Sequence, residues 1–119
     1  RRVLFRSAAI SLADSVENAC LIVFTRRGLA ATQAAVLRPE RAAIFAFSND
    51  PVVVRQLALA RDVTAFESPF LKDPARMIST ALDLLKEKGL ISSGQPVVIQ
   101  GDSLQGELLA DSIIFMRVE

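Results

Sequence analysis

The sequence predicts an α/β fold: a three-layer α/β/α sandwich around a mixed five-stranded sheet. Apolar runs such as residues 20–24 and 43–47 alternate with segments of helical periodicity, which is typical of parallel strands covered on both faces. The runs at 96–99 and 112–118 follow each other without a helix, which favours an antiparallel fifth strand. Right-handed crossovers then predict the strand order 3-2-1-4-5.

The first half of the chain is expected to alternate helix and strand twice. Apolar residues recur at helical spacing from Phe5 to Val16, and Asn18 is expected to end that helix in a left-handed conformation. The strand over 20–24 follows. A second helix over 29–37 ends because Pro39 disfavours helical angles at the residue before it, and the strand over 43–47 comes next.

The second half of the chain is predicted to contain two helices with recognisable cap residues. Asp50 and Pro51 begin one helix, with Val54, Leu57 and Ala58 predicted as its buried face before a short strand over 63–66. The next helix is expected to be capped by Asp73 and closed by Gly89, and four apolar residues are predicted to face inward. These four are Ile78, Ala81, Leu82 and Leu85.

Composition limits the classes of function. With 119 residues, 51% hydrophobic and 23% charged, residues 1–119 are expected to form a single domain. A net charge of +1 favours neither nucleic acid nor membrane as a partner, and the absence of a long apolar run or leader predicts a cytoplasmic protein. The chain contains no His, so Ser-His and Cys-His sites are excluded, and Cys20 is expected to be a buried, unreactive thiol.

The turn after the first strand is the strongest candidate for a binding site. A buried strand that passes through Gly28 into a helix directs free backbone N–H groups, and the positive end of the helix dipole, at the turn. This arrangement suits phosphate. The residues expected to bind it are Thr25, Arg26, Arg27, Gly28, Leu29, Ala30 and Ala31.

The predicted topology points to the same turn. Strand order 3-2-1-4-5 has a switch point between strands 1 and 4, where ligands of open α/β sheets bind. There the loop over 25–28 meets the loop over 100–106, so Gly101 and Asp102 are added to the expected site. Ordinary turn chemistry with solvated arginines is the alternative, because most arginines lie at the surface.

Several motifs in order resemble the carboxyl-terminal α/β domain of pyruvate kinases. They are the Thr25–Ala31 turn, the pair Arg38-Pro39, the stretch 54–59 followed by Arg61-Asp62-Val63, and the closing strand pair with Gly101 and Gly106. Asp62 stands where the family has glycine. The resemblance covers nearly the whole chain and implies the same five-stranded fold.

The resemblance implies an indirect role in catalysis. In that family a preceding barrel domain transfers the phosphoryl group from phosphoenolpyruvate to ADP with Mg²⁺ and K⁺, so this chain alone is expected to hold no catalytic residue, metal or cofactor. The family's α/β domain commonly binds a phosphorylated effector and contacts other subunits of a tetramer. An upstream catalytic barrel, a homo-oligomer and a phosphorylated effector are therefore the partners that the resemblance implies.

Departures from the family pattern limit the expected ligand. Members that bind a bisphosphate have hydroxyls where this chain has Arg27 and Ala30, and an aromatic and a basic residue where it has Asp102 and Ser103. One phosphate is therefore expected rather than two. A degenerate site without an effector and a free-standing phosphate-binding domain of the same fold stay as alternatives. A flavodoxin-like enzyme is disfavoured, because the turn supplies only one hydroxyl.

Overall fold

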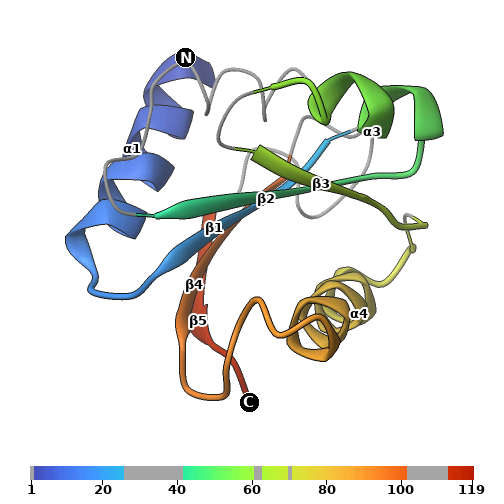
Figure 1. Cartoon of the computed structure of the whole chain (residues 1–119). Helices are drawn as coiled ribbons and strands as arrows, with labels where there is room; N and C mark the ends of the chain where they lie inside the picture. Colours follow the sequence, from blue (N-terminus) through green and yellow to red (C-terminus); the bar gives the residue numbers. More distant parts are fainter. Residues whose placement is uncertain (1, 26–41, 61–62, 70, 102–112) are drawn as a thin grey trace.

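The computed structural model describes residues 2–25, 42–60, 63–69, 71–101 and 113–119 (Figure 1). The described residues form three helices and five strands. Their order is α1 (Arg2–Ser15), β1 (Cys20–Phe24), β2 (Ala43–Ser48), α3 (Pro51–Leu57), β3 (Val63–Glu67), α4 (Pro74–Glu87), β4 (Pro96–Gly101) and β5 (Ile113–Arg117). The helix predicted over 29–37 and the loop residues after 101 lie outside the described residues.

The strands form one five-stranded sheet in the order β3-β2-β1-β4-β5, which confirms the predicted topology. β1 pairs in parallel with both β2 and β4, and β2 pairs in parallel with β3. β4 and β5 are antiparallel, also as predicted. The chain therefore leaves β1 toward one edge of the sheet and returns to its other side at β4, which makes β1 and β4 the two sides of the switch point.

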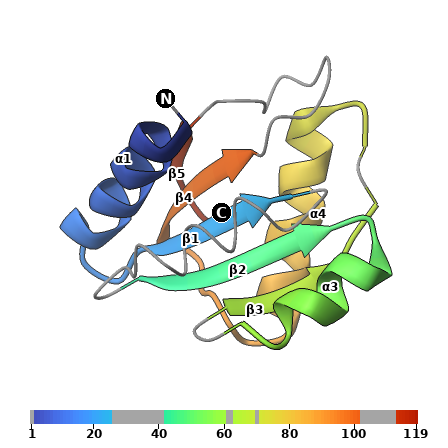
Figure 2. The same ribbon diagram turned by 90° about the horizontal axis from the view of Figure 1, so that it is seen from above.

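Helices cover both faces of the sheet and complete the three predicted layers. α1 and α3 lie on one face, and α4 lies on the other (Figure 1). α1 packs against β1 and β4, whereas α3 packs against β2 and β3 (Figure 2). The sheet is thus shielded from water on both sides along its central strands.

Each face of the sheet carries its own apolar cluster. Leu21 and Val23 belong to the cluster beneath α1 and α3, whereas Cys20, Ile22 and Phe24 belong to the cluster beneath α4. Because alternate residues of β1 enter opposite layers, all five are buried, and the strand reads as one uninterrupted apolar run. Each large side chain buried in this way contributes about 1.5–3 kcal/mol to folding.

Three phenylalanines form a row across neighbouring strands on the α4 face. The ring centroids of Phe24 and Phe47 lie 5.6 Å apart, and those of Phe47 and Phe66 lie 5.4 Å apart. Nζ of Lys88 lies 5.8 Å from the centroid of the Phe66 ring, which makes a cation–π interaction at the β3 end of the row. The row links β1, β2 and β3 through side chains as well as through their backbone ladders.

The predicted helix caps are confirmed. Oδ1 of Asp50 accepts a hydrogen bond from the Val52 N–H at 2.9 Å, and Oδ1 of Asp73 accepts one from the Ala75 N–H at 3.0 Å. A proline follows each cap residue at the first helical position, where no N–H is needed. The two carboxylates therefore fix where α3 and α4 begin.

The predicted left-handed stops are confirmed as well. Asn18 has a φ of 63° in the turn between α1 and β1, and Gly89 has a φ of 74° just after α4. The Gly89 N–H donates to the Lys86 carbonyl oxygen at 3.0 Å, which is how a glycine in this conformation satisfies the last turn of a helix.

The buried face of α3 differs from the predicted one. Val53 and Leu57 are buried, whereas Val54 is half-buried and Ala58 is exposed. Residues four positions apart share one face of a helix, so Val53 and Leu57 form a consistent pair. Leu57 is therefore confirmed, whereas the predictions for Val54 and Ala58 were wrong, because seven residues contain too few turns for the spacing of apolar residues to fix the inward face.

β4 also runs two residues beyond its predicted end at Ile99. Gln100 pairs with Val23 and Gly101 with Phe24, so both belong to the strand rather than to the loop. A strand held between two neighbours gains ladder hydrogen bonds on both sides, which outweighs the weak strand preference of a polar residue and a glycine. This extension carries β4 to the same level as the end of β1.

Candidate anion site at the carboxyl edge of the sheet

Thr25 lies directly after β1, at the carboxyl edge of the sheet. Its N–H donates to the Phe47 carbonyl oxygen at 2.9 Å, so Thr25 continues the pairing of β1 with β2 by one residue. Because side chains alternate along a strand, Thr25 shares the sheet face of Leu21 and Val23. Its side chain is fully buried, which brings a hydroxyl to the predicted site.

Gly101 lies beside Thr25 on the neighbouring strand. It is the last residue of β4 and pairs with Phe24, the residue that precedes Thr25. The structure thus brings Thr25 and Gly101 together at the switch point. The other predicted site residues lie outside the described residues, and their role stays a prediction. They are Arg26, Arg27, Gly28, Leu29, Ala30, Ala31 and Asp102.

Buried polar side chains mark the carboxyl ends of the four parallel strands. Thr25 follows β1, Ser48 ends β2, Ser68 follows β3 and Gln100 is the penultimate residue of β4. Each is at most 5% exposed, and within the described ranges these four are the buried polar side chains. Polar groups are therefore concentrated at the edge where ligands of such sheets bind.

Ser48 accepts hydrogen bonds from two neighbouring backbone groups, one through its side chain and one through its carbonyl oxygen. Oγ of Ser48 accepts a hydrogen bond from the Asp50 N–H at 3.2 Å, and the Ser68 N–H donates to the Ser48 carbonyl oxygen at 2.9 Å. These bonds join the ends of β2 and β3 to the start of α3. Ser48 therefore has a structural role beside the candidate site.

Gln100 differs from the other three buried polar residues at this edge. Its side chain is 2% exposed and lies between Val23 of β1 and Ile113 of β5 in the sheet register. Among the residues that the structure describes, its Oε1 has no hydrogen-bond donor. Leaving a buried acceptor unpaired costs about 1–3 kcal/mol. Sequence reasoning placed Gln100 in a loop and missed it, although a glutamine directly after a buried apolar run was the available signal.

Other chemistry in the described ranges is limited. Burial raises the pKa of the Cys20 thiol from 9.0 to about 12, which confirms the expected buried thiol. Within those ranges no three His, Cys, Asp or Glu side chains gather where they could hold a metal ion. No helix found there has the length and apolar character needed to cross a bilayer.

Comparison with known proteins identifies the family. The family described as "Pyruvate kinase, alpha/beta domain" matches residues 5–112. The chain is 31% identical over 99 residues to chloroplastic pyruvate kinase isozyme A of Nicotiana tabacum, covering 83% of this chain and 16% of that protein. It is 34% identical over 96 residues to chloroplastic isozyme G of Ricinus communis, covering 81% of this chain and 22% of that protein.

Solved structures agree in fold. A crystal structure of a pyruvate kinase from Cryptosporidium parvum superposes with a TM-score of 0.84 at 26% identity, covering 98% of this chain and 22% of that chain. Another structure of pyruvate kinase from this organism, in complex with ADP, gives a TM-score of 0.80. The chain thus spans about a fifth of the length of these relatives. With the sequence match over residues 5–112, the order of strands and the antiparallel β4–β5 pair, the chain belongs to the pyruvate kinase alpha/beta domain family.

Proposed function

We propose that this chain is the regulatory domain of a pyruvate kinase and that it binds one phosphate group of a small effector at the β1–β4 switch point. The observation that carries the proposal is the burial of Thr25 beside Gly101, at the ends of the two strands that define the switch. The turn after Thr25 contributes Arg26, Arg27 and Gly28 in the sequence. Guanidinium groups and free N–H groups are the donors that proteins use for phosphate.

The activity of the whole protein is part of the same proposal. A pyruvate kinase transfers the phosphoryl group of phosphoenolpyruvate to ADP with Mg²⁺ and K⁺, and we assign that chemistry to a separate catalytic barrel domain of the parent protein. The relatives are several times longer than this chain, which supports such an arrangement. The cytoplasmic location stays a prediction, because the plant relatives are named as chloroplast proteins.

A titration tests the effector site. Inorganic phosphate and glucose 6-phosphate are titrated by calorimetry into the wild-type chain and into the double variant Arg26→Ala, Arg27→Ala. A charge-assisted hydrogen bond contributes about 1.5–3 kcal/mol, so the double variant should bind about ten- to a hundredfold more weakly. The matched control is Arg55→Ala, Arg76→Ala, which removes two exposed arginines from α3 and α4 and should leave affinity unchanged.

The two ways in which the titration can fail differ. Equal affinity of the wild type and the Arg26→Ala, Arg27→Ala variant would remove the arginines from the site. Absence of saturable binding in the wild type would contradict the effector role, and the residues after Thr25 would then have no role in anion binding.

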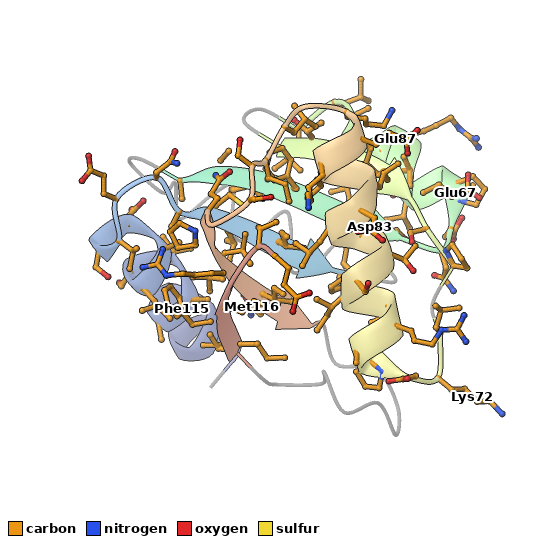
Figure 3. The ribbon with its side chains drawn as sticks, turned by 90° about the horizontal axis from the view of Figure 1, so that it is seen from below. Glu67, Lys72, Asp83, Glu87, Phe115 and Met116 are labelled. Atoms are coloured by element: carbon orange, nitrogen blue, oxygen red, sulfur yellow. The ribbon has the colours of Figure 1, made fainter. Side chains whose placement is uncertain are left out.

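We also propose that β5 contacts another subunit. β5 is an edge strand of the sheet, and an edge presents backbone N–H and C=O groups that can pair with a further strand. Phe115 is 44% exposed, and its neighbours Ile114 and Met116 are half-buried. Phe115 lies on the α1 side of β5 and Met116 on the α4 side (Figure 3). An apolar edge of this kind is typical of a strand that has a partner.

A further inference from the structure

We propose that the groove between α4 and the end of β5 binds a small primary amine with a short apolar chain, whose ammonium group lies against Asp83 and whose chain lies against Met116. The groove has a cavity volume of about 270 Å³. It lies on the α4 face of the sheet, whereas Thr25 lies on the opposite face. The proposal is therefore independent of the phosphate site.

One flank of α4 forms a wall of the groove, and the residues at the end of β5 and after it form the other wall. Ala75, Ser79 and Asp83 are spaced four residues apart, so they share this flank of the helix, and Lys86 continues it. Eleven residues from Ala75 to Lys86 extend about 16 Å along the helix axis. Figure 3 views this side of the sheet, where α4 lies beside the strand of Met116. The groove is thus elongated, which suits a linear ligand.

The inner surface of the groove is apolar. Ile78, Leu82 and Val118 line it and are at most 9% exposed, and Met116 is half-buried beside them. These side chains offer hydrocarbon and a thioether, which is only a weak hydrogen-bond acceptor. A methionine also adapts its shape to what it contacts. A ligand must therefore present an apolar chain to this surface and keep its polar group at the rim.

The charges at the rim favour a cation. Nζ of Lys86 donates to the Glu119 carbonyl oxygen at 2.7 Å, so the one ammonium group of the lining already has an acceptor at the carboxyl end of α4. Among the residues that the structure describes, the carboxylates of Asp83 and Glu119 make no hydrogen bond or ion pair. An ammonium group donates charge-assisted hydrogen bonds to a carboxylate, whereas an anion would be repelled by these two. Charge and shape together indicate an amine with an apolar chain.

Methionine methyl groups report directly on the groove. The chain contains two methionines: Met116 lines the groove, and Met77 is buried in the core at 1% exposure. The wild-type chain, labelled with ¹³C at its methionine methyl groups, is titrated with hexylamine, hexan-1-ol and hexanoate and followed by NMR. These probes share one chain length and differ in the charge of the head group. Substitution of Met116 by Leu assigns the two signals.

Hexylamine should shift the Met116 signal saturably at about millimolar concentration and shift the Met77 signal less. Hexan-1-ol should bind about fivefold more weakly, which is the size of one ion pair at a partly exposed site, and hexanoate more weakly still. Added salt should weaken the binding of hexylamine but not that of hexan-1-ol, because salt screens the ion pair.

Asp83→Asn tests the head-group contact. It should lower the affinity for hexylamine to that for hexan-1-ol and leave hexan-1-ol unchanged. The matched control is Glu87→Gln, which neutralises an exposed carboxylate one turn further along α4 that does not line the groove, and which should change neither affinity (Figure 3). Asp83 is exposed as well, so both variants should keep the fold.

Three outcomes would overturn the proposal. Equal affinity of the wild type for hexylamine and hexan-1-ol, or full affinity of Asp83→Asn for hexylamine, would show that the groove does not recognise an amine. Tighter binding of hexanoate would assign the head group to Lys86 instead. If no probe shifts the Met116 signal, the groove is not a binding site. None of the probes contains phosphate, so each of these results leaves the proposed phosphate site untouched.

Discussion

The side chain of Gln95 donates a hydrogen bond from Nε2 to the carbonyl oxygen of Asn18 at 3.0 Å, which joins two turns that lie 77 residues apart in the sequence. Its Oε1 accepts a hydrogen bond from the Ser92 N–H, also at 3.0 Å. Its carbonyl oxygen accepts one from the Val118 N–H at 2.9 Å. Gln95 thus links the segments of Asn18, Ser92 and Val118 by hydrogen bonds at the amino edge of the sheet, which is opposite the candidate site.

We expect Gln95→Ala to destabilise the protein by about 1–2 kcal/mol, because two side-chain hydrogen bonds of about 0.5–1.5 kcal/mol each are lost. Urea unfolding followed by circular dichroism measures the change. The control Gln56→Ala removes an exposed glutamine from α3 and should change stability by less than about 0.5 kcal/mol. Equal effects of the two substitutions would show that the bridge contributes nothing.

We expect Gly89→Ala to cost about 1–2 kcal/mol of stability through backbone strain alone. The φ of Gly89 is +74°, and a Cβ built there meets nothing within 4 Å, so there is no steric clash to add. Thermal unfolding measures the loss. Gly89→Asn should cost less than Gly89→Ala, because asparagine tolerates the left-handed region, and the reverse order would contradict the strain argument.

Burial of Cys20 should make stability fall at alkaline pH. The thiol titrates at 9.0 in its ordinary state and at about 12 in the folded protein, because burial disfavours the thiolate. Above pH 9 the unfolded chain has lost a proton that the folded chain keeps, so rising pH favours unfolding, by up to about 1.4 kcal/mol per pH unit. Urea unfolding at several pH values should show this slope in the wild type and a shallower one in Cys20→Val.

We expect the chain to self-associate through β5. Sedimentation equilibrium at tens of micromolar should give a dimer or larger species for the wild type and a monomer for Phe115→Glu, since a buried carboxylate opposes an apolar contact. Leu59→Glu is the matched control, because Leu59 is 89% exposed and far from β5 in the sheet order. A wild-type monomer throughout this range, or equal dissociation by both variants, would contradict the contact.

We expect no kinase activity from this chain alone, because we assign catalysis to a separate barrel domain of the parent protein. A coupled assay with phosphoenolpyruvate, ADP, Mg²⁺ and K⁺ measures pyruvate formation. Addition of a purified catalytic barrel from a relative is the positive control. Turnover above the blank by the isolated chain would overturn the assignment of catalysis to a separate domain.

Sequence sufficed where local chemistry determines the structure. The face of α4 was predicted correctly at Ile78 and Leu85 because a long helix repeats its apolar spacing over several turns, although Met77 was missed. Asp73 and Gly89 marked its two ends, since each residue type has a specific role there. Strand order followed from the handedness of crossovers and from the sequence pattern, which predicts no helix between the last two apolar runs.

Sequence did not suffice where long-range pairing decides the outcome. Whether Gln100 continues β4 depends on Val23 and Ile113, which lie on the strands on either side of it. The residues next to Gln100 in the sequence do not indicate that a strand pairs with β4 on each side. For the candidate site, Thr25 and Gly101 were predicted from the ends of apolar runs, whereas Gln100 became visible only once its burial was known.

The phenylalanine row on the α4 face has a practical consequence for spectroscopy. The chain contains neither tryptophan nor tyrosine, so it has no indole or phenol emission of its own. Phe66 ends the row on β3, where its ring is half-buried and contacts Phe47. A tryptophan introduced by Phe66→Trp would be the single indole of this chain. Any change in its fluorescence, on unfolding or on titration with a ligand, would therefore report the environment of one known position in the sheet.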